Sequence, residues 1–214
     1  MSETEKDTVR LLELVASRIC HDLISPVSAM ANGLEFMEEA GPDALPDAMD
    51  LLRFSSGVAS AKLRALRMAY GAGGSDPSIR LEDVRDVVAD LTRADGKITQ
   101  EWDFSSLPKA GQTPVGFAKI LMCGLLLAIE SLPRGGTIRI SGDGASSAQI
   151  HAKGPDAGPR EKVEAALSGL VPLDMMEPKL IHPHLTSLLA RAYGFSVTIA
   201  QRGDGQVVYR ITHA

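Results

Sequence analysis

The feature that most constrains the fold is a pair of long segments in which apolar residues recur every three, four or seven positions. The first runs from about Thr8 to Glu39, and the second runs from about Pro46 to Tyr70. Between them, Ala40-Gly41-Pro42-Asp43 supplies a glycine that favours a helix end and a proline that cannot continue a helix. The pattern predicts two amphipathic helices in an antiparallel hairpin. The apolar positions are Leu12, Val15, Ile19, Leu23, Met30, Leu34 and Met37 on the first helix, and Leu45, Met49, Leu52, Ala59, Leu63, Leu66 and Tyr70 on the second.

These apolar stripes are too broad for the two helices to cover one another completely. A further surface is therefore needed, and a second copy of the hairpin is the most economical one. This predicts a homodimer held by a four-helix bundle. The alternative is that the stripes pack on the second half of the same chain.

The segment Gly71-Ala72-Gly73-Gly74-Ser75-Asp76-Pro77 is rich in residues that break periodicity and free the backbone, which predicts a linker. We therefore expect a helical hairpin domain over residues 1–72 and a second domain over 73–214. The mixture of helices and mostly antiparallel strands beyond the linker predicts an α+β protein, with an α/β sandwich that has one helical layer. The expected helices are Arg80–Ala94, Pro114–Ser131, Arg160–Leu170 and Pro183–Tyr193, and the expected strands are Ile98–Phe104, Thr137–Ser141, Gln149–Lys153, Ser196–Gln201 and Val207–Thr212.

Composition argues against several functions. A formal charge of -5 has the wrong sign for binding a nucleic-acid backbone, and aromatic residues make up only 4%, too few for base-stacking platforms. The longest apolar run, Leu125 to Ile129, is far shorter than the roughly 20 residues of a membrane span. The N-terminus lacks the apolar core of a signal peptide, so we expect a cytoplasmic protein.

The cysteines and the paired histidines predict no disulfide or metal site. Cys20 and Cys123 have neither CxxC nor Cys/His spacing, and Cys20 is expected to be a buried small apolar residue. His182 and His184 form an H-x-H pair with no third ligand, so we expect capping or solvent exposure. No metal or cofactor is expected to bind this chain.

One polar motif, Cys20-His21-Asp22-Leu23-Ile24-Ser25-Pro26, lies on the first predicted helix. His21 falls off the apolar stripe and is expected to face solvent. The unprotonated nitrogen of an exposed imidazole can attack phosphorus and form a phosphoramidate. Asp22 can orient the ring or accept its proton. We predict His21 and Asp22 as catalytic residues.

A partner protein is expected to dock on the face around His21. Small side chains there leave room for an acidic pocket to approach the ring. Pro26 lacks an N–H and clashes with the carbonyl four residues earlier, so it is expected to bend the helix, at a cost of roughly 3 kcal/mol that favours a functional explanation. The predicted docking residues are Arg18, Ser25, Pro26, Ser28 and Ala29.

The string His21-Asp22-Leu23-Ile24-Ser25-Pro26 resembles the H-box of sensor histidine kinases, which lies on the first helix of a dimeric hairpin. The second half resembles the Bergerat-type ATP-binding domain of these kinases, because the segment from Leu125 to Ile138 looks like the helix that ends in a proline and a glycine pair before a strand. In those kinases the helix carries an asparagine that holds Mg²⁺, but the corresponding residue here is Leu127. Ala152 stands where the kinases have an adenine-reading aspartate. ATP binding is therefore not expected, and Gly135-Gly136 is interpreted as a tight turn.

A Bergerat-like domain without nucleotide residues, fused to an H-box hairpin, resembles the ChpT type of histidine phosphotransferase. The resemblance implies a homodimer in a bacterial phosphorelay that takes phosphoryl onto His21 from the receiver domain of a hybrid kinase. It then passes the group to the receiver domain of a response regulator, with Mg²⁺ held by the partner. The region from Arg160 to Ala166 could form a secondary docking face. Two alternatives stay open: a divergent kinase that uses ATP, and a non-catalytic scaffold that binds a receiver.

Overall fold

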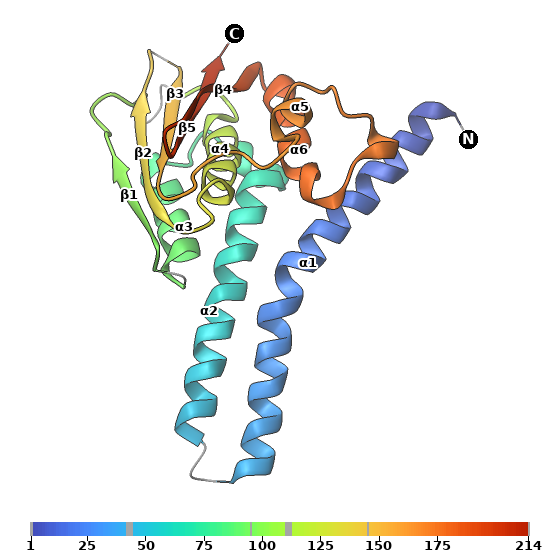
Figure 1. The fold of residues 1–214 in the computed structure, drawn as a ribbon, viewed down its shortest axis with the longest axis vertical. Helices are drawn as coiled ribbons and strands as arrows, with labels where there is room; N and C mark the ends of the chain where they lie inside the picture. The colour runs from blue at the N-terminus through green and yellow to red at the C-terminus, as the bar shows by residue number, and fades with distance from the viewer. Residues whose placement is uncertain (1, 42–44, 95, 110–112, 145, 214) are drawn as a thin grey trace.

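The computed structural model describes residues 2–41, 45–94, 96–109, 113–144 and 146–213. A hairpin of two long helices, α1 (Glu3–Ala40) and α2 (Leu45–Tyr70), extends from one side of an α/β domain (Figure 1). At the start of α1, the hydroxyl of Ser2 accepts a hydrogen bond from the N–H of Glu5, and the carboxylate of Glu5 accepts one from the N–H of Ser2. At the other end, Gly41 has a φ of 74°. The predicted hairpin is confirmed, although Pro42 and Asp43 of the predicted break lie outside the described residues.

Small residues bring the two helices of the hairpin close together. A Cβ added to Gly33 would lie 3.3 Å from Cγ of Leu52. The contact stripe is narrower than predicted, because Leu12, Leu34 and Leu63 are 63%, 53% and 50% exposed. Apolar surface on the hairpin is therefore left uncovered within this chain. The buried residues of α2 are Ala48, Ser55, Ala59, Ala61, Ala65 and Ala69.

The α/β domain is built on a five-stranded sheet with the order β1-β2-β3-β5-β4. Strands β1 and β2 are parallel and the other pairs are antiparallel, as the sequence predicts. Helices cover one face of this sheet (Figure 1). The strands are β1 Ile98–Trp102, β2 Gly136–Gly142, β3 Ala148–Lys153, β4 Phe195–Gly203 and β5 Gln206–His213, and the helices are α3 Leu81–Arg93, α4 Phe117–Glu130, α5 Val163–Leu167 and α6 Ile181–Ala192, with short 3-10 turns η2 Ala72–Ser75, η3 Leu173–Met175 and η4 Pro178–Leu180.

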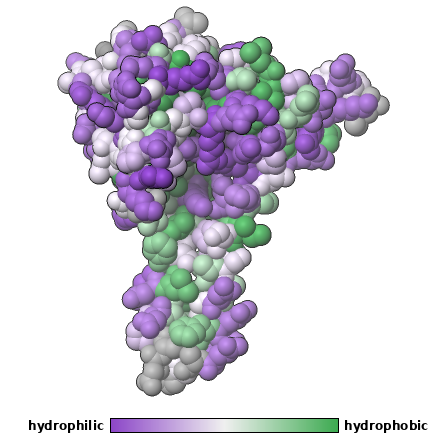
Figure 2. Space-filling view, viewed as in Figure 1, coloured by the Kyte–Doolittle hydropathy of each residue, from purple (hydrophilic) through white to green (hydrophobic). Residues whose placement is uncertain are grey.

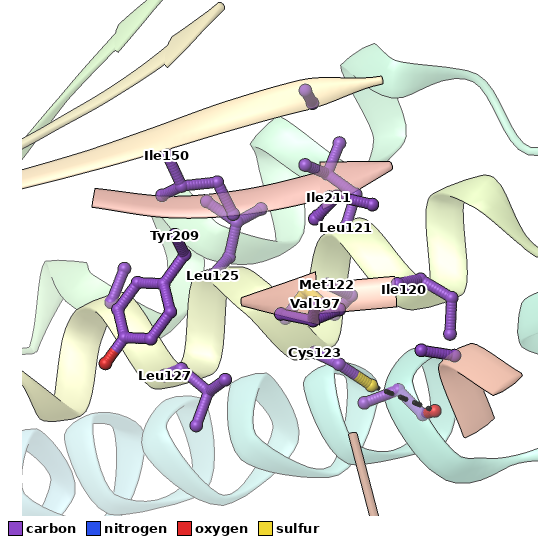
Figure 3. Packing of buried hydrophobic residues seen from close by; sticks show 14 of the residues in the cluster. Ile120, Leu121, Met122, Cys123, Leu125, Leu127, Ile150, Val197, Tyr209 and Ile211 are labelled. Atoms are coloured by element: carbon purple, nitrogen blue, oxygen red, sulfur yellow. Dashed lines mark hydrogen bonds between the residues drawn. The ribbon is translucent and has the colours of Figure 1, made fainter. Parts of the chain in front are cut away.

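Helix α4 lies at the centre of the core. Leu121 and Leu125 point toward Ile150 and Ile211 of the sheet, whereas Leu127 points to the other side of α4 (Figure 3). On that other side α4 packs against α2. Because nearly every residue of α4 is buried, the helix has almost no polar face, and its burial joins the hairpin to the sheet in one hydrophobic core.

The connection between the two halves differs from the predicted linker. Residues Ala72–Ser75 form the tight turn η2, and a Cβ added to Gly74 would lie 1.9 Å from the carbonyl oxygen of Met68. The buried Lys119 donates hydrogen bonds to the carbonyl oxygens of Ala69 at 3.2 Å and Gly71 at 2.6 Å. The prediction that this segment frees the backbone is wrong, because these glycines permit close packing instead of flexibility. The division into residues 1–72 and 73–214 stays a prediction.

In the parts of the chain that the structure describes, no helix is both long enough and apolar enough to cross a membrane.

Candidate active site

His21 lies on α1 at the level of the α/β domain, and its side chain is 84% exposed. The predicted solvent exposure is therefore confirmed. Nδ1 of the ring is 3.3 Å from Oδ1 of Asp22, at the long end of the hydrogen-bond range. Because an ionised carboxylate only accepts hydrogen bonds, this contact requires the proton of a neutral ring to be on Nδ1. The lone pair is then on Nε2.

Asp22 belongs to a chain of ion pairs that the sequence analysis did not find. Its Oδ2 is 2.7 Å from Nε of Arg18, and a terminal nitrogen of Arg18 is 2.6 Å from Oε1 of Glu130 at the end of α4. The three side chains are 19%, 21% and 17% exposed for Arg18, Asp22 and Glu130. Burial alone would lower the pKa of Arg18, but the charge of Glu130 and the hydrogen bond to Asp22 raise it above its usual value.

Pro26 lies inside α1, and the helix continues through it. The ring nitrogen has no hydrogen, so the carbonyl of Asp22 loses the intrahelical hydrogen bond that residue 26 would otherwise donate. Nζ of Lys62 on α2 donates to this carbonyl at 2.9 Å instead. Figure 1 shows α1 leaning away from α2 toward its N-terminus. Lys62 thus compensates for the hydrogen bond that the proline removes.

The predicted docking residues do not all lie on the surface. Ser25 and Ser28 are exposed, Ala29 is half-buried, and Pro26 is buried. Pro26 therefore shapes the helix backbone and offers little side-chain surface to a partner. Arg18 is engaged by two carboxylates.

His21 opens on a cleft of about 520 Å³ between α1 and the α/β domain. Arg160 lines this cleft, and the docking role suggested for its region stays a prediction. Glu177 also lines it, and the hydrogen bond and charge of Lys179 lower the pKa of this carboxyl below its usual value. Periodicity could not have found Glu130, because it is 112 residues from Arg18. The lining residues are Ser17, Arg18, His21, Asp22, Glu130, Arg160, Glu177, Pro178, Lys179.

The positions where the kinase resemblance requires nucleotide ligands are buried. Leu127 is 2% exposed and Ala152 is 0% exposed, and both belong to the core. Gly135 and Gly136 form a tight turn, as predicted: the N–H of Gly136 donates to the carbonyl of Lys97 at 2.8 Å, and a Cβ on Gly136 would lie 2.2 Å from the carbonyl oxygen of Lys153.

Two smaller predictions are wrong. Cys20 is exposed, whereas Cys123 is buried. His182 and His184 are both buried, not solvent-exposed. Nε2 of His182 lies 3.1 Å from the carbonyl oxygen of Cys123, which can only accept, so Nδ1 accepts from the hydroxyl of Tyr70 at 2.5 Å. Through these two hydrogen bonds, His182 of α6 links α2 to α4.

Comparisons with known proteins find similar proteins that cover most of this chain. The family described as "Histidine phosphotransferase C-terminal domain" matches residues 81–205. The curated "Protein phosphotransferase ChpT" of Brucella abortus (strain 2308) is 35% identical over 191 residues, which cover 87% of this chain and 88% of that protein.

Among solved structures, "1.7 Angstrom Structure of a Bacterial Phosphotransferase" is 31% identical and has a TM-score of 0.78, covering 99% of this chain and 98% of the other. The structure of the Acinetobacter baumannii histidine kinase AdeS covers 89% of this chain and 95% of its own, with 14% identity and a TM-score of 0.46, which is too low to carry an argument. With a family match over residues 81–205 and a relative 35% identical along most of its length, this chain belongs to the histidine phosphotransferase family.

Proposed function

We propose that this phosphotransferase carries the phosphoryl group on Nε2 of His21 and exchanges it with the aspartate of a receiver domain in a phosphorelay. The observation that supports this most strongly is the geometry of the ring. His21 is 84% exposed, and Asp22 contacts Nδ1 at 3.3 Å, which leaves Nε2 directed away from the carboxylate.

In the transfer step, the Nε2 lone pair attacks the phosphorus of the aspartyl phosphate. The P–N bond forms while the bond from phosphorus to the aspartate oxygen breaks, and the aspartate leaves as a carboxylate. The ring keeps its proton on Nδ1 and becomes cationic, so the charge of Asp22 stabilises it. The reverse sequence passes the group to the next receiver. Mg²⁺, expected on the partner, would neutralise charge on the phosphoryl oxygens.

The receiver is proposed to dock over the small side chains near His21. Ser25 and Ser28 are exposed on the same helix face at four and seven residues from His21, and Ala29 is beside them. On the other side of the ring, the cleft adds Arg160 and Lys179 from the α/β domain. The positive charge of Arg160 complements the acidic aspartate pocket of a receiver, whereas Lys179 is paired with Glu177.

We also propose a homodimer held by the hairpin. Ile24, Val27 and Leu34 on α1 are 64%, 51% and 53% exposed and are spaced by three and seven residues, so they form one exposed stripe. Phe54 on α2 is 57% exposed. Figure 2 shows hydrophobic surface along the hairpin. Exposed apolar surface of this extent on a helical hairpin fits a four-helix bundle with a second copy.

Negative charges placed on the exposed apolar surface of the hairpin test the dimer. A Leu34→Glu, Phe54→Glu double variant should elute as a monomer in light-scattering chromatography, while the wild type has twice that mass. The control is Leu170→Glu, because Leu170 is 75% exposed but lies outside the hairpin. A wild type of monomeric mass at micromolar concentration would refute the dimer.

We propose that phosphoryl transfer does not use ATP, because of the residues that occupy the positions of the nucleotide and Mg²⁺ ligands of histidine kinases. The side chains of Leu127 and Ala152 offer no polar atom to a nucleotide or to its metal, and both are buried. If the chain is instead a divergent kinase, saturable ATP binding will be accompanied by label on His21. The cytoplasmic location predicted from the sequence stays a prediction.

The main test is incubation of the purified protein with a ³²P-phosphorylated receiver domain, with and without ATP. Label should move to this chain without ATP, and His21→Ala should remain unlabelled. Equal labelling of His21→Ala would refute the proposal. A non-catalytic scaffold would bind the receiver with unchanged affinity and take no label in either form.

A further inference from the structure

One continuous chain of hydrogen bonds and ion pairs leads from the α/β domain to the ring of His21. It starts at Glu130, the last residue of α4, and passes through Arg18 and Asp22 to Nδ1 of His21. Its steps measure 2.6, 2.7 and 3.3 Å. Only the last step is solvent-exposed, because the three charged side chains are at most 21% exposed whereas His21 is 84% exposed.

The two oxygens of Asp22 have separate partners. Oδ2 pairs with Arg18, and Oδ1 faces Nδ1 of His21. Fixing Oδ2 restricts rotation of the carboxylate, and this rotation would otherwise carry Oδ1 away from the ring. Arg18 is itself fixed from the opposite side by Glu130, because a guanidinium donates to two carboxylates in defined directions.

The backbone of Asp22 is held independently. Pro26 removes the hydrogen bond that its carbonyl would receive within α1, and Lys62 from α2 supplies another at 2.9 Å. Asp22 is therefore fixed at its carbonyl by α2 and at its side chain by α4. Both helices are packed in the hydrophobic core, so the position of this carboxylate is coupled to the folded domain.

The geometry points to Glu130 and Arg18 as positioning residues for phosphotransfer. They hold the carboxylate of Asp22 against Nδ1 of His21, so that the α/β domain selects Nε2 as the attacking nitrogen. In this role Arg18 acts within the protein, through Asp22. This inference rests on the proposed role of His21.

Single-turnover transfer from a phosphorylated receiver tests the inference, with the maximal rate and the half-saturating receiver concentration measured separately. Glu130→Gln should lower the maximal rate about tenfold, by analogy with residues that orient a metal-bound histidine, whose replacement costs about 10–100-fold. The half-saturating concentration should not change. In an Asp22→Asn background, Glu130→Gln should cost less than about twofold, because residues that act through one another are not additive.

The chain offers a matched control. Arg64 on α2 and Asp90 on α3 form another ion pair between the hairpin and the α/β domain, but neither is linked to Asp22. Asp90→Asn should therefore keep the wild-type maximal rate. Thermal melting identifies any variant whose loss of rate follows loss of fold.

A spectroscopic measurement reports the ring directly. In ¹⁵N-labelled protein above the titration range of histidine, two-bond nitrogen–proton couplings distinguish the two neutral tautomers. The share of His21 with its proton on Nδ1 should fall in Glu130→Gln and stay at the wild-type value in Asp90→Asn.

Four results would overturn the inference. They are an equal fold reduction in rate for Glu130→Gln in the wild-type and Asp22→Asn backgrounds, a change confined to the half-saturating concentration, an equal loss of rate for Asp90→Asn, and a wild-type rate for Glu130→Gln. Failure of the proposed function has a different signature, because His21→Ala would then still accept label. A wild-type rate for Glu130→Gln together with an inactive His21→Ala would refute the positioning role alone.

Discussion

Many large apolar side chains are exposed on the hairpin, whereas most are buried in the α/β domain. The hairpin leaves Ile24, Leu34 and Phe54 more than half exposed, whereas the side chains of α4 and of the inner sheet face are almost all buried. The α/β domain thus supplies most of the single hydrophobic core, whereas the hairpin keeps large apolar side chains on its surface. Figure 2 shows the same contrast, with hydrophobic patches along the lower hairpin and a mainly polar upper body.

The largest expected effect tests this contrast in the core. Leu125 is 0% exposed and packs between α4 and the sheet, so Leu125→Ala should lower the free energy of unfolding. We expect a loss of about 2–5 kcal/mol in urea titrations, the usual cost of such a truncation in a core. Leu170→Ala, at a side chain that is 75% exposed, should cost far less. Equal losses at the two positions would contradict the contrast.

A smaller effect is expected at the proline of α1. Lys62→Met should lower the free energy of unfolding by about 1–3 kcal/mol, because the carbonyl of Asp22 loses its hydrogen-bond donor. In a Pro26→Ala background the new N–H can donate to the same carbonyl, so the cost of Lys62→Met should shrink. A full double-mutant cycle measures this coupling. If the cost is the same in both backgrounds, Lys62 does not compensate for Pro26.

The smallest effect is a pH dependence of stability. Burial lowers the pKa of His182 below its usual value, and burial acts in the same direction on His151 and His184. The unfolded chain therefore takes up protons near pH 6.5 that the folded protein resists, so stability should fall as the pH drops below about 6.5. Replacing His182 by Asn should reduce this slope by up to about 1.4 kcal/mol per pH unit. An unchanged slope would show that His182 does not contribute.

The sequence predicted most of the helices and strands and the mainly antiparallel sheet because their signals are local, but the predicted helix Arg160–Leu170 is helical only over Val163–Leu167. Apolar periodicity along α1 and α2, and turn residues between the strands, depend on neighbours within a few positions. The linker was misjudged because glycines favour both flexibility and close packing, and only the tertiary structure shows that Gly74 lies against the backbone of Met68.

The candidate site was predictable only in part, because only some of its contacts join residues that are close in the sequence. The exposure of His21 and its contact with Asp22 follow from helix geometry and sequence adjacency. Glu130 and Lys62 have no local signal, because they are 112 and 40 residues away from the side chain and carbonyl that they bind. The ion pair of Arg18 with Glu130 could not be predicted from helix spacing, because the guanidinium contacts a residue of α4, and the assignment of Arg18 as a docking residue stays a prediction.

Mapping the phosphorylated atom tests the central claim most directly. After transfer from a labelled receiver, proteolysis at alkaline pH followed by electron-transfer mass spectrometry locates the phosphate among the 5 histidines of the chain. Nitrogen–phosphorus couplings in the ¹⁵N-labelled protein then assign the phosphate to Nε2 or Nδ1. We predict one acid-labile phosphate on His21, bonded to Nε2. Phosphate on another residue, or on Nδ1 of His21, would contradict this prediction.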